Sequence, residues 1–232
     1  MVDFGESVAV TSLTLARRFA AGATMWCIAP QSPEHARHVA VEFVHPVLVG
    51  KRALPAVSIE SADPVAALRS LVRAGDVVLA ISSDDSPAVI EIMRRAGAWG
   101  VTTVWIGAGP RPTPRSADHI VWVDDDAASH ASPAFHDGRL VLAYHVLWEL
   151  THVCFEHPGL LKPDTDVACD DEVCITCSDE GRLGEVIAAA KFGRARVRTA
   201  RGIEMIDTTI IAEVAPGDLV LIHAGTAISE IP

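Results

Sequence analysis

The C-terminal third of the chain carries two cysteines and a histidine whose chemistry suits a metal. Cys174 and Cys177 form a C-x-x-C pair, and His223 ends an apolar run, 219–222, that is typical of a strand. A thiolate is a soft ligand suited to iron or zinc, and an imidazole nearby can accept the thiol proton when a metal binds. The pair alone leaves three alternatives open: half of a zinc site, a redox pair, or two buried thiols.

A second candidate metal site lies near the N-terminus. His38 and Glu42 are four residues apart in a segment that is expected to be a helix, so they share one face and could bind one ion. The alternative is an ordinary pair on a helix surface. Further ligands or catalytic groups would come from a long helix expected over 140–155, which offers three residues: His145, Glu149 and His152.

The elements that position these residues alternate regularly. Helices are expected at 7–21, 34–43, 63–72, 87–96 and 140–155, and strands at 23–29, within 47–59, and at 77–82, 101–106 and 120–123. This alternation predicts an α/β fold with a doubly wound parallel sheet and helices on both faces. Ligands of such sheets bind at the carboxyl ends of the strands, which here points to the turns at 29–34 and 82–87.

The hydrophobic period changes after residue 172. Short strand-like segments are expected at 173–177, 184–189, 195–199, 203–211 and 219–223, separated by glycines. Such even spacing predicts a small OB-like β-barrel. We therefore expect an α/β domain at 1–161, a linker at 162–172 and a barrel at 173–232.

Composition excludes several classes of protein. The net charge of −11 over 232 residues argues against a nucleic-acid-binding protein, which needs a basic surface. The five cysteines lack the spacing of a disulfide framework, and the acidic start of the chain does not resemble a signal peptide. Charged and polar residues interrupt the longest apolar segment, so no membrane span is expected. We expect a protein of the reducing cytoplasm.

The first two thirds of the chain resemble a known domain. Segments 38–43, 54–57, 75–83 and 117–118 are similar to those of the sugar isomerase (SIS) domain, in particular its phosphoheptose isomerase branch. The resemblance implies that two loops hold a sugar phosphate, that His38 and Glu42 serve metal binding and acid–base work, and that the domain forms a homodimer through its helices.

The two loops nevertheless depart from the family pattern. The first has no glycine and contains two prolines, which cannot donate backbone hydrogen bonds. The second would bind phosphate through Ser82, Ser83 and Ser86, but Asp84 and Asp85 stand between them. A like-charge pair about 5 Å apart costs roughly 3 kcal/mol at an effective dielectric near 20, whereas a hydrogen bond contributes about 1 kcal/mol. This predicts a catalytically degenerate domain with a vestigial phosphate loop.

The C-terminal part resembles the HypC/HupF-type [NiFe]-hydrogenase maturation chaperone. Segments 184–187, 202–207 and above all 217–228 carry the likeness, although Cys174 is internal and the family's Pro-Gly after the cysteine is absent. The resemblance implies that Cys174 and His223 hold a transient Fe(CN)2CO fragment, which passes from a HypD-type scaffold protein to the hydrogenase large-subunit precursor.

The sequence thus favours a metallochaperone that is not an enzyme. Two other functions stay open: a sugar-phosphate isomerase with an appended barrel, and an interaction module that zinc stabilises.

Overall fold

The computed structural model describes residues 4–123, 133–161, 181–190 and 192–231. The chain divides into two compact units. Unit 1 comprises residues 1–94 and 102–163, and unit 2 comprises residues 164–232 with 95–101. The expected linker at 162–172 and the expected strand at 173–177 lie outside the described residues.

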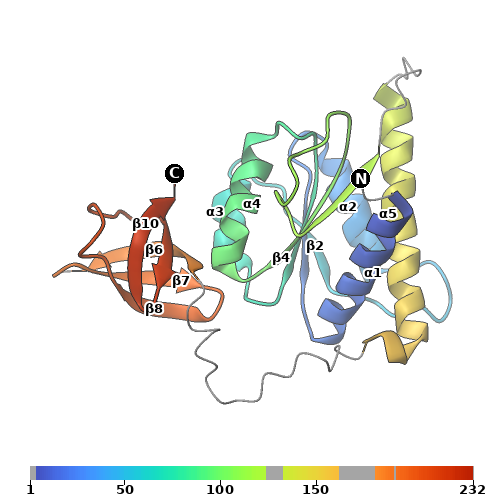
Figure 1. Cartoon of the computed structure of the whole chain (residues 1–232). Coiled ribbons are helices and arrows are strands. Elements are labelled where there is room, and N and C mark those ends of the chain that lie inside the picture. Colours follow the sequence, from blue (N-terminus) through green and yellow to red (C-terminus); the bar gives the residue numbers. More distant parts are fainter. Residues whose placement is uncertain (1–3, 124–132, 162–180, 191, 232) are drawn as a thin grey trace. The chain divides into compact units, whose positions relative to one another are not determined.

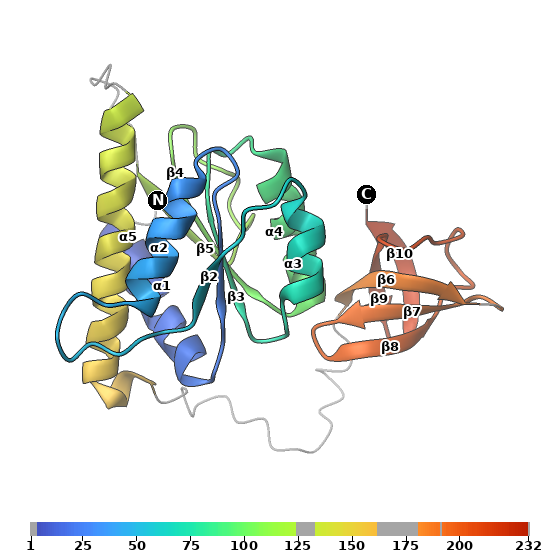
Figure 2. The same cartoon turned by 180° about the vertical axis from the view of Figure 1, so that it is seen from behind.

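Unit 1 contains a parallel sheet of five strands between two layers of helices (Figures 1 and 2). The strand order is β2-β1-β3-β4-β5, and every neighbouring pair is parallel. Helices α1, α2 and α5 cover one face, and α3 and α4 cover the other. The predicted α/β fold is therefore confirmed. The strands are β1 (Met25–Ile28), β2 (Ala56–Ser58), β3 (Val77–Ile81), β4 (Thr102–Ala108) and β5 (His119–Val123).

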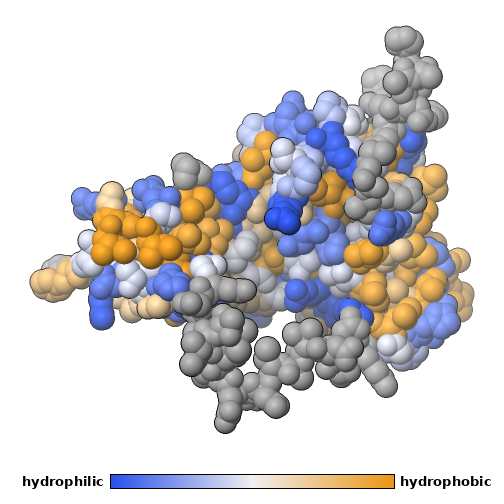
Figure 3. All heavy atoms as spheres, in the orientation of Figure 1, coloured by the Kyte–Doolittle hydropathy of each residue, from blue (hydrophilic) through white to orange (hydrophobic). Residues whose placement is uncertain are grey.

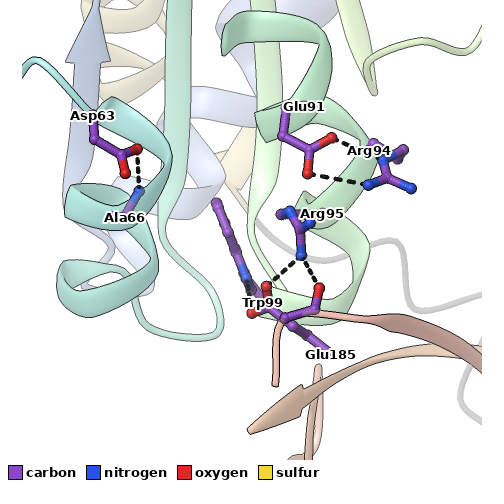
Figure 4. Close-up of polar contacts among 8 residues, drawn as sticks. Asp63, Ala66, Glu91, Arg94, Arg95, Trp99 and Glu185 are labelled. Atoms are coloured by element: carbon purple, nitrogen blue, oxygen red, sulfur yellow. Dashed lines mark hydrogen bonds and ion pairs between the residues drawn. The ribbon is translucent and has the colours of Figure 1, made fainter. Parts of the chain in front are cut away.

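The helices begin where proline and capping residues allow it. Proline cannot donate a backbone hydrogen bond and has a helical φ, so it suits a first helical position, and four of the five helices begin with one. At α3 the Asp63 carboxylate accepts a hydrogen bond from the Ala66 N–H at 2.9 Å (Figure 4). The helices are α1 (Phe4–Ala20), α2 (Pro33–Val44), α3 (Pro64–Leu71), α4 (Pro87–Trp99) and α5 (Pro133–Glu156), with a short 3-10 helix at Pro158–Leu161.

The core of unit 1 lies against the central strand. All five residues of β3 are buried, as expected for a strand covered on both faces. Val77, Leu79 and Ile81 pack into the cluster that also holds buried residues of α1, α2 and α5. Among the described parts of the chain, no helix is long and apolar enough to cross a membrane.

Unit 2 contains a mixed sheet of five strands. Their order, β10-β8-β7-β6-β9, closes on itself because β10 also pairs with β9. The contact between β8 and β10 is one parallel pair, Thr226 opposite Asp207, so unit 2 is a mixed five-stranded sheet and the OB type remains a prediction. The strands are β6 (Arg182–Ala190), β7 (Arg194–Thr199), β8 (Gly202–Asp207), β9 (Leu219–His223) and β10 (Thr226–Ile231).

One strand boundary and one additional strand in unit 2 differ from the prediction. The strand expected over 203–211 ends at Asp207, whose side chain accepts hydrogen bonds from the backbone N–H and the hydroxyl of Thr209 at 2.8 and 2.6 Å. This local turn diverts the backbone from the sheet. Strand β10 was not expected, because segment 217–228 was interpreted as a metal-site motif and not as a hairpin.

Candidate metal centre

Two helices bring three ligand-type side chains together in unit 1. His38 and Glu42 lie one turn apart on α2, and His145 comes from α5. The Glu42 Oε1 atom is 3.4 Å from Nε2 of His38 and 3.5 Å from Nε2 of His145. The three candidate ligand atoms all lie within 4.8 Å of one another, and the three side chains are half-buried. The predicted pairing of His38 with Glu42 on one helix face is present, and α5 adds a third ligand.

A layer of aromatic residues fixes the orientation of these side chains. The Tyr144 hydroxyl is 2.9 Å from Nδ1 of His38, so the other ring nitrogen of His38 faces Glu42. The same hydroxyl is 3.4 Å from Nδ1 of His35. The Trp148 indole donates to the Glu42 backbone carbonyl at 2.9 Å, which ties α5 to α2 beside the site. Partners of this kind orient metal ligands and set their tautomer.

The donor set fits a zinc ion. Two imidazoles and one carboxylate, with a fourth position open to solvent or substrate, form one of the ligand sets found in catalytic zinc sites. Zinc–ligand distances of about 2.0–2.2 Å place neighbouring tetrahedral donors about 3.4 Å apart. The two separations measured at Glu42 match that spacing. The half-buried position keeps the trio reachable by a solute.

The other candidates on α5 have structural roles. Glu149 forms an ion pair with Lys51 at 3.2 Å. His152 is buried, and its ring nitrogens lie 2.9 Å from the Trp148 carbonyl oxygen and 3.0 Å from that of Arg52. These contacts hold the chain after α2 against α5, and of the three candidates on this helix His145 is the one that joins the cluster with His38 and Glu42.

The proposed thiol–imidazole site remains a prediction. His223 is half-buried at the end of β9, opposite Thr226 of β10. Cys174 and Cys177 lie outside the described residues, so neither the iron site nor the alternatives for the C-x-x-C pair can be placed.

The serine loop after β3 is largely occupied by its own contacts. The Ser82 hydroxyl accepts from the Trp105 indole at 3.0 Å and donates to the Ser83 carbonyl at 2.9 Å. The Ser83 hydroxyl donates to the Asp85 carboxylate at 2.6 Å. Ser86 is buried. The hydroxyls of Ser82 and Ser83 therefore have partners within the unit.

Sequence reasoning missed the loop after β4. It carries Arg111 and Arg115, which line a cavity at the same edge of the sheet. The position of this loop could have indicated the two arginines as candidates. The loop follows a buried strand of a parallel sheet, and ligands of such sheets bind at the carboxyl ends of the strands.

Comparison with known proteins supports the fold of unit 1. No protein-family model matches the chain, and no curated protein matches it. A phosphoheptose isomerase from Francisella tularensis is similar with a TM-score of 0.52 and 14% identity, over 63% of this chain and 85% of that one. Phosphoheptose isomerase GmhA from Neisseria gonorrhoeae gives a TM-score of 0.49 at 19% identity, over 62% and 84% of the two chains. The first likeness shows a phosphosugar-isomerase-type fold, and identities this low show nothing more.

The comparisons overturn the predicted hydrogenase-maturation function. The similar structure with a TM-score above 0.5 is a phosphoheptose isomerase, and that likeness gives no support to a HypC/HupF-type domain. The interpretation of the chain as a carrier of Fe(CN)2CO, with a degenerate and non-enzymatic SIS domain, is therefore wrong.

Hairpin geometry gives a physical reason for that error. Gly217, Ala224 and Gly225 have positive φ, and Asp218 accepts a hydrogen bond from the Ala215 N–H at 2.6 Å. These residues build the turns at both ends of β9. The motif over 217–228 therefore serves the geometry of a hairpin without requiring a metal.

Proposed function

We propose that unit 1 is a metal-assisted sugar isomerase that interconverts the aldose and ketose forms of a phosphorylated sugar. The observation that carries the proposal is the cluster of His38, Glu42 and His145, on a fold similar to that of a phosphoheptose isomerase. Zinc is the ion that this donor set fits best.

The reaction requires a proton acceptor beside the sugar carbonyl. Aldose–ketose interconversion removes a proton from the carbon next to the carbonyl and returns a proton to the former carbonyl carbon. A divalent ion held by the trio would polarise the carbonyl oxygen of the sugar. Glu42 faces both imidazoles through Oε1, so the other oxygen of its carboxylate is the proton acceptor that the cluster would offer to the sugar, while the two imidazoles would hold the ion. Tyr144 keeps the His38 ring in the orientation that this requires.

The acidic loop after β3 limits how the sugar is bound. Asp84 is half-buried and Asp85 is exposed, and both repel a phosphate dianion at Ser82, Ser83 and Ser86. The proposal therefore places the reacting carbons of the sugar at the trio and assigns no phosphate contact to the serine loop.

A homodimer through unit 1 remains part of the proposal. Figure 3 shows hydrophobic side chains gathered over α1 and α5. Val10 of α1 is 51% exposed and Leu142 of α5 is 63% exposed, so both would be covered in a dimer that pairs through these helices. Light scattering after size-exclusion chromatography tests this, and a monomer would contradict it.

Exchange of substrate protons with solvent tests the proposed activity. The zinc-loaded protein is mixed in deuterium oxide with heptose, pentose and hexose phosphates, and NMR follows deuterium uptake and the aldose–ketose ratio. We expect exchange with at least one of these sugars, and its loss in Glu42→Gln and His145→Ala. Glu149→Gln is the matched control, because it lies one turn further along α5 and pairs with Lys51 instead. A wild-type protein without exchange, or variants as active as the wild type, would contradict the proposal.

A further inference from the structure

A second cavity of unit 1 is rich in arginine. It has a volume of about 610 Å3 and lies between α4, β4 and the loop that joins β4 to β5. Arg94 of α4 and Arg111 and Arg115 of the loop line it, together with one carboxylate, Asp84. The volume is in the range of small-molecule sites. In a chain of net charge −11, three guanidinium groups around one cavity are an unusual concentration of positive charge.

The arginines differ in their partners. Arg94 is held by Glu91 through two hydrogen bonds of 3.0 and 3.1 Å (Figure 4). Arg111 and Arg115 are exposed and have no hydrogen-bond or ion-pair partner among the residues that the structure describes. Arg115 also has a φ of 71°, a conformation that non-glycine residues rarely adopt outside tight turns and ligand sites.

We propose that this cavity binds a phosphate monoester of a small organic molecule. A guanidinium group presents a planar fork of donors that matches phosphate oxygens. A phosphate monoester carries close to two negative charges at neutral pH, so it balances the two unpartnered arginines charge for charge, whereas a single carboxylate does not. The Thr113 hydroxyl can add a hydrogen bond, and Ile90 and Met93 provide an apolar wall for the organic group.

This site is separate from the metal centre. The lining of the cavity includes none of His38, Glu42 and His145. The trio belongs to α2 and α5, on the opposite face of the sheet from α4 (Figure 1). The two groups of residues are therefore distinct, and anion binding in this cavity does not depend on the isomerase proposal.

Calorimetric titration of the full-length, EDTA-treated protein tests the site, with inorganic phosphate, phenyl phosphate and acetate as probes. We expect one site per chain, tighter for phenyl phosphate than for phosphate because of the apolar wall, and weak or absent for acetate. Arg111→Gln and Arg115→Gln should each weaken phosphate binding by about tenfold or more, since hydrogen bonds to charged groups are worth that much. Asp84→Asn should strengthen it several-fold, because it removes the one negative charge of the lining.

Two control variants make the outcome specific. Arg73→Gln removes an exposed arginine just after α3 and should leave binding unchanged. His145→Ala should also leave it unchanged, which separates this site from the metal centre. Thermal unfolding confirms that the variants fold. The proposal is overturned if the wild type binds no phosphate, if the Arg111→Gln/Arg115→Gln double variant binds as the wild type does, or if Arg73→Gln weakens binding equally.

Discussion

Substitution of Tyr144 by phenylalanine tests whether the aromatic layer serves the metal centre. Tyr144 is the only tyrosine of the chain and is almost fully buried, so the change removes one hydroxyl and little else. That hydroxyl fixes Nδ1 of His38 at 2.9 Å and leaves the opposite ring nitrogen facing Glu42. In Tyr144→Phe the His38 ring can rotate or change tautomer. Binding of the ion must then also fix the orientation of this ring, which lowers the metal affinity.

The expected magnitude follows from this role. Loss of a partner that orients a metal ligand typically lowers metal affinity 10–100-fold, which corresponds to about 1.4–2.8 kcal/mol. At a fixed free zinc concentration, the variant should lose that amount of zinc-dependent stabilisation. Loss of one buried hydrogen bond should lower the stability of the metal-free protein by only about 1 kcal/mol.

Competition with a fluorescent zinc chelator measures the affinity, and thermal unfolding with and without zinc measures the stabilisation. Thr151→Val is the control: its buried hydroxyl lies on the same helix and donates to the Leu147 carbonyl at 2.7 Å, away from the trio. Thr151→Val should lower the stability of the metal-free protein about as much as Tyr144→Phe does, and it should leave the zinc affinity unchanged. If Tyr144→Phe binds zinc as tightly as the wild type while His38→Ala does not, the hydroxyl does not position the ligand and this reasoning fails.

Three further predictions concern stability and reactivity. Ala224 has a φ of 47° in the β9–β10 turn, so Ala224→Asn should raise the free energy of unfolding of unit 2 by about 0.5–1 kcal/mol, measured by urea denaturation. The hydrogen bonds from Arg182 hold the pKa of Glu204 below its usual value of 4.5. This stabilisation is complete above about pH 4.5 and is lost as the pH falls through the lower, folded-state pKa, so Glu204→Gln should show a smaller loss of stability in acid; an unchanged pH profile would contradict this. Burial raises the pKa of the Cys27 thiol well above its usual range, so iodoacetamide at pH 8 should modify Cys27 only after denaturation, as peptide mass spectrometry can show.

The α/β fold was predictable because its signals are local. The run of five apolar residues at 77–81 predicts a central strand, and prolines at 33, 64 and 87 mark helix starts whatever the rest of the chain does. Caps are less predictable than helix starts: the Ser32 side chain makes no capping hydrogen bond at α2, whereas Asp63 makes one at α3. A serine before proline permits a cap but does not fix the rotamer that makes it.

The metal centre was only half predictable, for a geometric reason. A spacing of four residues places His38 and Glu42 together on any helix. The choice among His145, Glu149 and His152 depends on the rotation of α5 about its axis, which packing sets. The indole of Trp148 bonds to the Glu42 carbonyl, and this contact turns His145 toward α2. Since that contact spans 106 residues of sequence, no local pattern contains it.

The predicted repulsion of phosphate at the serine loop concerns one loop of the sheet edge alone. At an effective dielectric near 20, each aspartate about 5 Å from a phosphate charge costs roughly 3 kcal/mol, and each arginine at the same distance returns as much. Asp84 and the two unpartnered arginines line the same cavity, although they come from loops after different strands. The electrostatic potential at the carboxyl edge of a parallel sheet is the sum over all its loops. Summed over the loops after β3 and β4, two aspartates and two arginines balance, so the loop after β3 alone does not decide the sign of the potential. Asp85 does not line the arginine cavity, where two unpartnered arginines face one aspartate, so we expect an anion to be favoured there.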